Sequence, residues 1–248
     1  MGQEHIPTAI KSGPDGFRRS MIAGLQLAFM GALSLLLTTL ISPHAAMNGD
    51  IQIKILFVGR MVALIAVATL LLRLSGRRWA DVGLRKVKRS RFLLAIPLGL
   101  AGALAIVSAA QVVAAKLGIQ HTPSDYRFAT LRGNLGLYLF YLIPVTWGTA
   151  AIGEEMLFRG FFLDALLRLF GSGGPIGTTI AVIAQAVIFG LLHLYQGAAG
   201  ASVAGALGLA LGFVWWFSGR NLWAGIVMHG ILDSISMTGL YLGLIGPH

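Results

Sequence analysis

The sequence predicts an all-α fold, a polytopic bundle of transmembrane helices in a single domain. Of the 248 residues, 56% are hydrophobic and 11% are charged, and the mean hydropathy is +0.79. A soluble domain usually has about 25% charged residues. Several apolar runs reach the roughly 20 residues that a helix needs to cross a hydrocarbon core about 30 Å thick. These runs are continuous, whereas the strands of a membrane β-barrel alternate polar and apolar residues, so the pattern argues against a barrel.

The apolar runs predict about seven spans, or eight, within residues 21–248, after a polar cytoplasmic segment at 1–20. The first span covers about 21–41, and it is expected to be a retained anchor because its apolar run exceeds that of a signal peptide. The later spans cover about 53–74, 92–117, 135–170, 176–194, 199–217 and 221–242. The fourth span is long, and we expect it to end where a Gly-rich turn at 171–175 begins.

Basic residues predict the orientation of the chain. Eight of the 19 Lys and Arg residues lie between Arg73 and Arg91. Such clusters favour cytoplasmic loops that face anionic lipid headgroups. We therefore expect the N-terminus in the cytoplasm and the C-terminus outside. The expected location of this integral membrane protein is the bacterial inner membrane. Nucleic-acid binding is the weaker interpretation of the cluster, so we expect no nucleic-acid partner. The absence of cysteine excludes disulfides, thiolate nucleophiles and Cys-ligated metals.

Two adjacent glutamates, Glu154 and Glu155, lie in the fourth span, where residues 135–152 carry no charge. Burying an ionised carboxylate in hydrocarbon costs roughly 2.5–3.5 kcal/mol on insertion scales. Two such residues side by side are therefore a hypothesis for a functional site. Glu155 and Arg159 are four residues apart and share a helix face, so we expect a structural ion pair. Glu154 is turned by about 100° from that face and is free for chemistry.

Two histidines are predicted to reach the depth of Glu154. Glu154 lies 19 residues before Gly173, and His193 lies 19 residues after Gly174, so an antiparallel hairpin brings them to one level. His229 is eight residues into the seventh span, roughly 12 Å from its cytoplasmic end. All three sites then share one level in the inner half of the membrane.

Helical spacing also pairs the two histidines with neighbours. His229 and Asp233 share a face, and Phe189 lies one turn before His193, so that an aromatic ring is expected under the imidazole. Taken singly, each of these residues has a structural alternative, because histidines in membrane helices often form interhelical hydrogen bonds. Their matched depth favours a functional site. The Gly208–Gly212 segment, by contrast, indicates close helix packing.

Three motifs therefore stand in order along the membrane helices: Glu154-Glu155-Met156-Leu157-Phe158-Arg159, Phe189-Gly190-Leu191-Leu192-His193 and His229-Gly230-Ile231-Leu232-Asp233. This set resembles the CAAX protease and bacteriocin-processing family, also called the Abi or CPBP family of intramembrane proteases. The resemblance covers mainly residues 135–240. The segment 79–85, Trp-Ala-Asp-Val-Gly-Leu-Arg, is similar to a short segment often found before a span of that family.

The resemblance implies a helical bundle with a site open to the cytoplasm, in which Glu154 and His193 activate a water molecule. It further implies that His229 and Asp233 stabilise the oxyanion. Asp233 departs from the Asn of the prenyl-protein branch, and an ionised Asp cannot donate a hydrogen bond to an oxyanion. Asp233 therefore either orients His229 or is itself protonated. This departure weakens the inference of prenyl-protein processing more than that of proteolysis.

The resemblance thus implies an intramembrane endopeptidase that hydrolyses a peptide bond of a membrane-associated protein or peptide without a cofactor. Zinc is the alternative, because Glu154, His193, His229 and Asp233 are all able to ligate a metal. The rival class is a non-catalytic immunity or scaffold protein that binds a partner with the same cluster. A membrane transporter is the third alternative, since polar residues near the middle of the bilayer also line transport paths.

Overall fold

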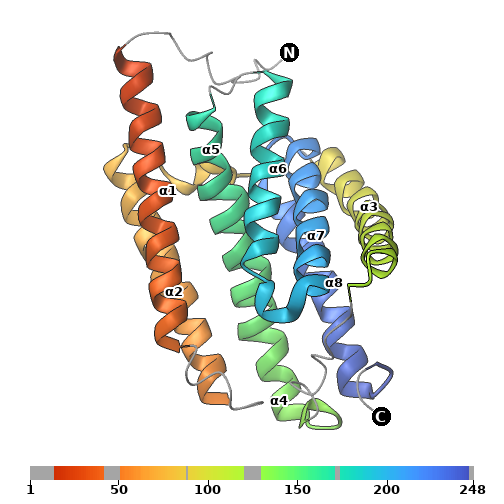
Figure 1. Cartoon of the computed structure of the whole chain (residues 1–248). Helices are drawn as coiled ribbons and strands as arrows, with labels where there is room; N and C mark the ends of the chain where they lie inside the picture. Colours follow the sequence, from red (N-terminus) through yellow and green to blue (C-terminus); the bar gives the residue numbers. More distant parts are fainter. Residues whose placement is uncertain (1–13, 42–50, 88, 120–129, 171–173, 246–248) are drawn as a thin grey trace.

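The computed structural model describes residues 14–41, 51–87, 89–119, 130–170 and 174–245, and these residues form helices and connections without a strand (Figure 1). The all-α prediction is therefore confirmed. The elements are α1 (Pro14–Ile41), α2 (Ile51–Leu74), η2 (Trp79–Val82), α3 (Arg89–Lys116), α4 (Leu135–Phe140), η4 (Tyr141–Phe162), α5 (Leu163–Leu169), α6 (Pro175–Leu191), η5 (Leu194–Gln196), α7 (Gly197–Phe217) and α8 (Leu222–Leu242).

Five helical stretches within the described residues are long and apolar enough to cross a membrane. They are Gly16–Ile41, Lys54–Leu74, Arg89–Lys116, Leu135–Leu169 and Leu194–Phe217. The two other predicted spans correspond to α6, which is apolar but has only 17 residues, and to α8, whose polar side chains lower its mean hydropathy. Most of the predicted cytoplasmic segment and the turn at 171–173 lie outside the described residues.

α4, η4 and α5 form one continuous helix from Leu135 to Leu169, as the apolar pattern predicts. It begins at Asn134, whose side chain accepts a hydrogen bond from the backbone N–H of Leu137 at 3.0 Å. The middle part, η4, is π-helical. At its end, the backbone N–H of Leu163 donates to the carbonyls of Gly160 and Phe158. η4 packs against α2 and α8, and most of its second half is buried. This helix is therefore the centre of the core.

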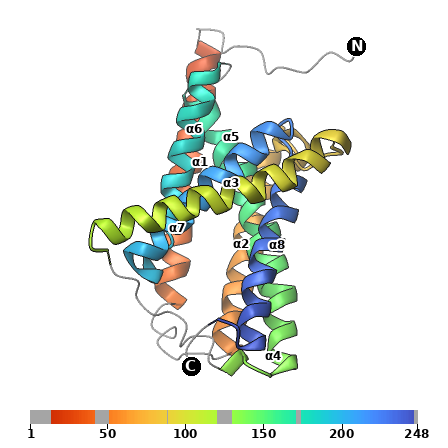
Figure 2. The same cartoon turned by 90° about the vertical axis from the view of Figure 1, so that its right-hand side faces the viewer.

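Small residues bring α6 and α7 together, as the Gly208–Gly212 segment predicts. A Cβ atom added at Gly212 would stand 2.6 Å from Val182, and one added at Gly208 would stand 3.1 Å from the backbone of Ala186. The helices therefore touch almost backbone to backbone. α3 covers the other side of α7 and is steeply inclined to α1, α2 and α8 (Figure 2).

The segment 79–83, after α2, contacts α2, η4 and the start of α8 at one end of the molecule. The Trp79 indole donates to Thr69 at 2.9 Å and packs on Gly160 of η4. Gly83 has φ +112°, and its carbonyl accepts from the N–H of Leu222 at 3.0 Å. A side chain at Gly83 would stand 2.8 Å from a backbone oxygen of the α7–α8 connection. The segment that resembles a family motif thus fixes where α8 begins.

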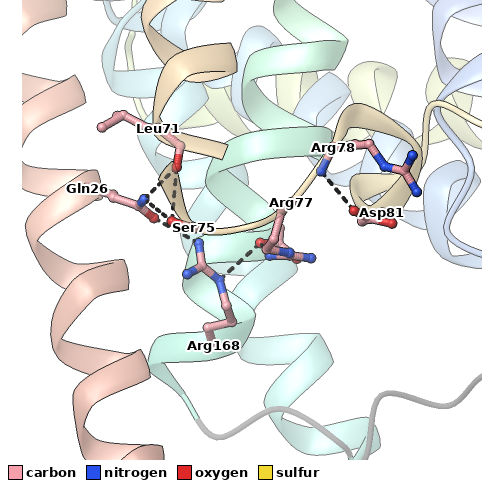
Figure 3. A network of polar contacts seen from close by, with 8 residues as sticks. Gln26, Leu71, Ser75, Arg77, Arg78, Asp81 and Arg168 are labelled. Carbon is pink, nitrogen blue, oxygen red and sulfur yellow. Dashed lines mark hydrogen bonds and ion pairs between the residues drawn. The ribbon is translucent and has the colours of Figure 1, made fainter. Parts of the chain in front are cut away.

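A polar network ties α1, α2 and α5 at the same end (Figure 3). Asp164 accepts hydrogen bonds from both outer nitrogens of Arg77 and from Arg168 at 3.1 Å. Arg168 also donates to Gln26 at 3.0 Å, and the Gln26 amide donates to Ser75 at 2.8 Å. The α2–α3 connection, the end of α5 and the start of α8 therefore lie together, while α8 ends at the opposite end (Figure 1).

Candidate active site

The predicted pair of Glu155 and Arg159 lies at the centre of the bundle. Both side chains are 0% exposed, and Arg159 Nη1 donates to Glu155 Oε1 at 2.8 Å. The other outer nitrogen of Arg159 donates to the Gly208 carbonyl of α7 at 3.2 Å. The guanidinium carbon lies 4.7 Å from the centre of the Phe189 ring. Arg159 therefore joins η4 to α6 and α7, and the structural pairing that the sequence predicts is confirmed.

The same carboxylate also holds a histidine of α8. His229 is buried, and its Nδ1 lies 3.2 Å from Glu155 Oε1. Its other ring nitrogen, Nε2, lies 3.6 Å from Asp233 Oδ2. Arg159, Glu155, His229 and Asp233 therefore form one continuous chain from the core to a side chain that is 32% exposed. Helical spacing predicts the two ends of this chain, but it does not predict the link between Glu155 and His229.

α8 comes very close to Glu155. A Cβ atom added at Gly225 would stand 2.6 Å from Glu155 Oε2. Within the described part of the chain, Glu155 Oε2 and Arg159 Nε are buried without a hydrogen-bond partner. The carboxylate is thus clamped between η4 and α8, which fixes the rotation of His229 relative to η4.

His193 lies two residues beyond the end of α6, in the turn that leads to η5. It was expected inside a span that reaches residue 194, but the helix ends at Leu191. The ring centres of His193 and Phe189 are 4.6 Å apart, so the predicted ring below the imidazole is present. His193 Nδ1 lies 2.7 Å from the Phe189 carbonyl. Because a carbonyl oxygen only accepts, Nδ1 carries the proton, and Nε2 of the neutral ring is an acceptor.

Glu154 is arranged differently from Glu155. Its side chain is partly exposed, and it has no hydrogen bond or ion pair with the other described residues. It does interact electrostatically with His193, His229 and Asp233. The four predicted residues come from η4, the α6–α7 connection and α8, and Glu154 lies within electrostatic range of the other three. Glu155, in contrast, contacts His229 directly.

Two further residues approach this group, although the motifs do not include them. Arg60 of α2 interacts electrostatically with Glu154 and with Tyr195 of η5. A charge inside an apolar span is the signal that points to Arg60 in the sequence. Trp147 donates to Ser234 at 3.1 Å, and its ring occupies the space beside Gly230. Neither contact follows from helical spacing.

The alternative of a zinc site needs several ligands that point at one position. Among the residues that the structure describes, no group of three or more His, Cys, Asp or Glu side chains is arranged to hold a metal ion. Of the four candidate ligands, His229 is already engaged with Glu155, which in turn pairs with Arg159. The donor set therefore does not fit a structural or catalytic zinc site in this arrangement.

Comparison with protein families supports the resemblance that the motifs indicate. Residues 136–235 match the family described as Type II CAAX prenyl endopeptidase Rce1-like. The match covers less than half of the 248 residues, but it includes all three motifs. Neither the curated proteins nor the solved structures gave a match. The matched description is that of a prenyl endopeptidase family, and five helical stretches of the described residues are long and apolar enough to cross a membrane.

Proposed function

Because residues 136–235 match the type II CAAX prenyl endopeptidase Rce1-like family, we propose that this protein hydrolyses peptide bonds of membrane-associated substrates with a water molecule activated by Glu154 and His193. One observation carries the proposal. Of the two adjacent glutamates, Glu155 is occupied by Arg159 and His229, whereas Glu154 has no hydrogen bond or ion pair among the described residues and interacts electrostatically with His193 and His229. An unpaired carboxylate at such a position is available to accept a proton.

In the proposed reaction, Glu154 takes a proton from water as the water oxygen adds to the scissile carbonyl carbon. His193 accepts a hydrogen bond from the same water through Nε2. The carbonyl oxygen becomes an oxyanion in a tetrahedral intermediate. Glu154 then gives its proton to the leaving nitrogen, the C–N bond breaks, and the two products are a carboxylate and an amine.

The oxyanion requires a donor, and His229 is the candidate. Glu155 accepts from Nδ1–H of His229, so the ring is held with Nε2 directed toward Asp233. A protonated His229 donates through Nε2 to the oxyanion, while Glu155 holds the ring at Nδ1 and Asp233 orients Nε2 before the oxyanion forms. Alternatively, a protonated Asp233 donates directly. In both versions Glu155 and Arg159 position the donor and do not touch the substrate.

We further propose that the end with the basic residues faces the cytoplasm of a bacterial cell. A pocket at this end is lined by Thr69, Leu72, Arg73, Arg77, Arg78, Trp79 and Ala80. Arg73 and Arg78 are exposed, and within the described residues neither side chain has an ion-pair partner. Such a pocket suits anionic lipid headgroups, and Trp favours the membrane interface. The N-terminus is then cytoplasmic, and residues 21–248 act as one helical domain.

The decisive experiment replaces the proposed base. Glu154→Gln keeps the shape of the side chain but cannot accept a proton, so turnover of a membrane-peptide panel should fall by about 10²- to 10⁴-fold. The purified variant should keep the thermal stability of the parent. Asp81→Asn makes the same chemical change outside the site and should leave turnover unchanged.

Near-normal turnover by the Glu154→Gln variant would remove Glu154 as the base. The rival interpretation, a non-catalytic immunity or scaffold protein, makes a different prediction. In that case the panel is not cleaved by the parent, and partner binding survives the Glu154→Gln change.

A further inference from the structure

Arg60 lies outside the residues that match the family, yet it approaches the site from α2. It is about 14 Å from the first residue of α2 and about 21 Å from the last, so it lies well inside a span. A cation at that depth is costly and usually has a partner or a function. The position of the Arg60 charge, deep inside a span, therefore calls for a partner or a function.

Contacts hold Arg60 in place but do not neutralise it. Its Nη1 donates to the Thr38 hydroxyl of α1 at 2.7 Å, and its guanidinium carbon lies 5.6 Å from the centre of the Phe57 ring. Its Nε is buried without a hydrogen-bond partner in the described part of the chain. No carboxylate of the described residues lies within ion-pair distance of the guanidinium. The side chain is thus positioned by neutral groups and keeps its charge available.

The packing of α2 on η4 aims this charge at the reaction centre. Met61 fills the space beside Gly153, where an added Cβ atom would stand 2.5 Å from the Met61 side chain. Their neighbours Arg60 and Glu154 therefore lie at one level on facing helices. They interact electrostatically but form no ion pair within 4.0 Å. Arg60 also interacts with Tyr195, two residues after His193, so it lies on the same side of the bundle as that histidine.

We propose that Arg60 is a substrate-binding residue that receives the C-terminal carboxylate of the peptide substrate. This proposal rests on the proposed function. A substrate of the C-a-a-X type ends in a free carboxylate three residues after its cysteine. An extended chain rises about 3.3–3.6 Å per residue, so if the bond after the cysteine is the one cut, the carboxylate lies only about 10 Å beyond it. It must lie in the low-dielectric part of the bundle, where it needs a cation.

Arg60 meets this need better than the other nearby cation. Arg159 is fully buried and already paired with Glu155, whereas Arg60 is partly exposed. A guanidinium binds a carboxylate through two parallel hydrogen bonds. Arg60 and Glu154 do not form an ion pair with each other, so the carboxylate of a substrate does not compete with Glu154 for the guanidinium. Arg60 then selects substrates whose scissile bond lies close to a free C-terminus.

The test compares one peptide with a C-terminal acid and the same peptide with a C-terminal amide. The parent protein should cleave the acid with a kcat/KM about 10- to 100-fold higher, as expected for a charge-assisted hydrogen bond. Arg60→Gln should remove this preference by raising KM for the acid by more than it changes KM for the amide. Arg73→Gln removes an arginine about 20 Å further along α2 and should keep the preference.

Equal cleavage of acid and amide by the parent would overturn the proposal. So would an Arg60→Gln variant that loses kcat equally on both peptides, because Arg60 would then act on Glu154 alone. If the Gln variant does not fold, Arg60→Lys replaces it. The preference of the Lys variant for the acid should fall, because an ammonium group cannot form the two parallel hydrogen bonds of a guanidinium. An unchanged preference would contradict the proposal.

The proposal is separable from the proposed function by a binding measurement. If the parent cleaves no peptide, the proposed function fails, and fluorescently labelled acid and amide peptides are titrated into the Glu154→Gln variant. Tighter binding of the acid, abolished by adding Arg60→Gln, supports the carboxylate site independently of catalysis. Equal binding of both peptides overturns it.

Discussion

The helix from Leu135 to Leu169 carries two acid–arginine pairs of identical spacing, Glu155–Arg159 and Asp164–Arg168, and their surroundings differ sharply. The first pair is 0% exposed, whereas the side chains of the second are 17% and 21% exposed. In the second pair the carboxylate bridges two arginines at the edge of the bundle. In the first it bridges an arginine and a histidine at the centre.

The difference shows that spacing along a helix decides whether a pair forms, while depth decides what the pair does. At the edge, water solvates part of each charge, so the network of Asp164 mainly ties helices together. At the centre, each charge depends on its partner, and removal of one partner leaves a buried charge. The central pair therefore fixes the orientation of His229 with little freedom, as its proposed role as the oxyanion donor requires.

The largest effect on stability is expected from Arg159→Ala. The change leaves Glu155 buried without its counter-charge, so the free energy of unfolding should fall by about 3–5 kcal/mol. The measurement is the folded fraction and the unfolding transition in detergent micelles. Glu155→Ala should behave similarly. A variant that folds normally but loses catalysis selectively would mean that the roles of the two glutamates are exchanged.

A double variant sharpens this prediction. Glu155→Met combined with Arg159→Met replaces both buried charges by apolar side chains, which restores much of the stability that either single change loses. It cannot restore the contact from the carboxylate to His229. Recovered folding with absent turnover would separate the structural from the positioning role of the pair.

A smaller effect is expected at the edge of the bundle. Asp164→Asn leaves Arg77 and Arg168 without their carboxylate, but both arginines are partly exposed, so the expected loss is about 1–2 kcal/mol. Salt screens partly exposed charges, so the difference from the parent should shrink in 1 M salt, where the Debye length is about 3 Å. A loss as large as that of Arg159→Ala, and insensitive to salt, would contradict the comparison.

The sequence was sufficient for contacts within one helix and insufficient for contacts between helices. The spacing of Glu155 and Arg159 predicts their pair, and that of Phe189 and His193 predicts the ring under the imidazole. Composition predicts the all-α bundle and the continuous fourth helix. These predictions need only the helical repeat, which is the same in every helix.

Contacts between helices depend on rotation and distance, which small residues set by packing. Gly225 allows Glu155 to approach α8, and Gly153 allows Met61 and hence Arg60 to approach η4. The position of a glycine in the sequence does not identify the helix that it will contact. For the same reason, the sequence did not show that α6 ends before His193, since the chain there continues without a strong breaker.

The smallest effect is expected from metal removal, and it tests the chemistry of the central cluster against that of the edge. The edge network has one carboxylate and two arginines, so it offers no metal site, whereas the central cluster has histidines and carboxylates. One of the candidate ligands in this cluster, His229, is already held by Glu155. A chelator should therefore leave turnover unchanged, and elemental analysis of active protein should find no stoichiometric zinc.

One zinc per chain, with turnover lost when the zinc is removed and regained when it is added back, would replace the metal-free mechanism. Glu154, His193, His229 and Asp233 would then act as ligands of a metal that activates the water.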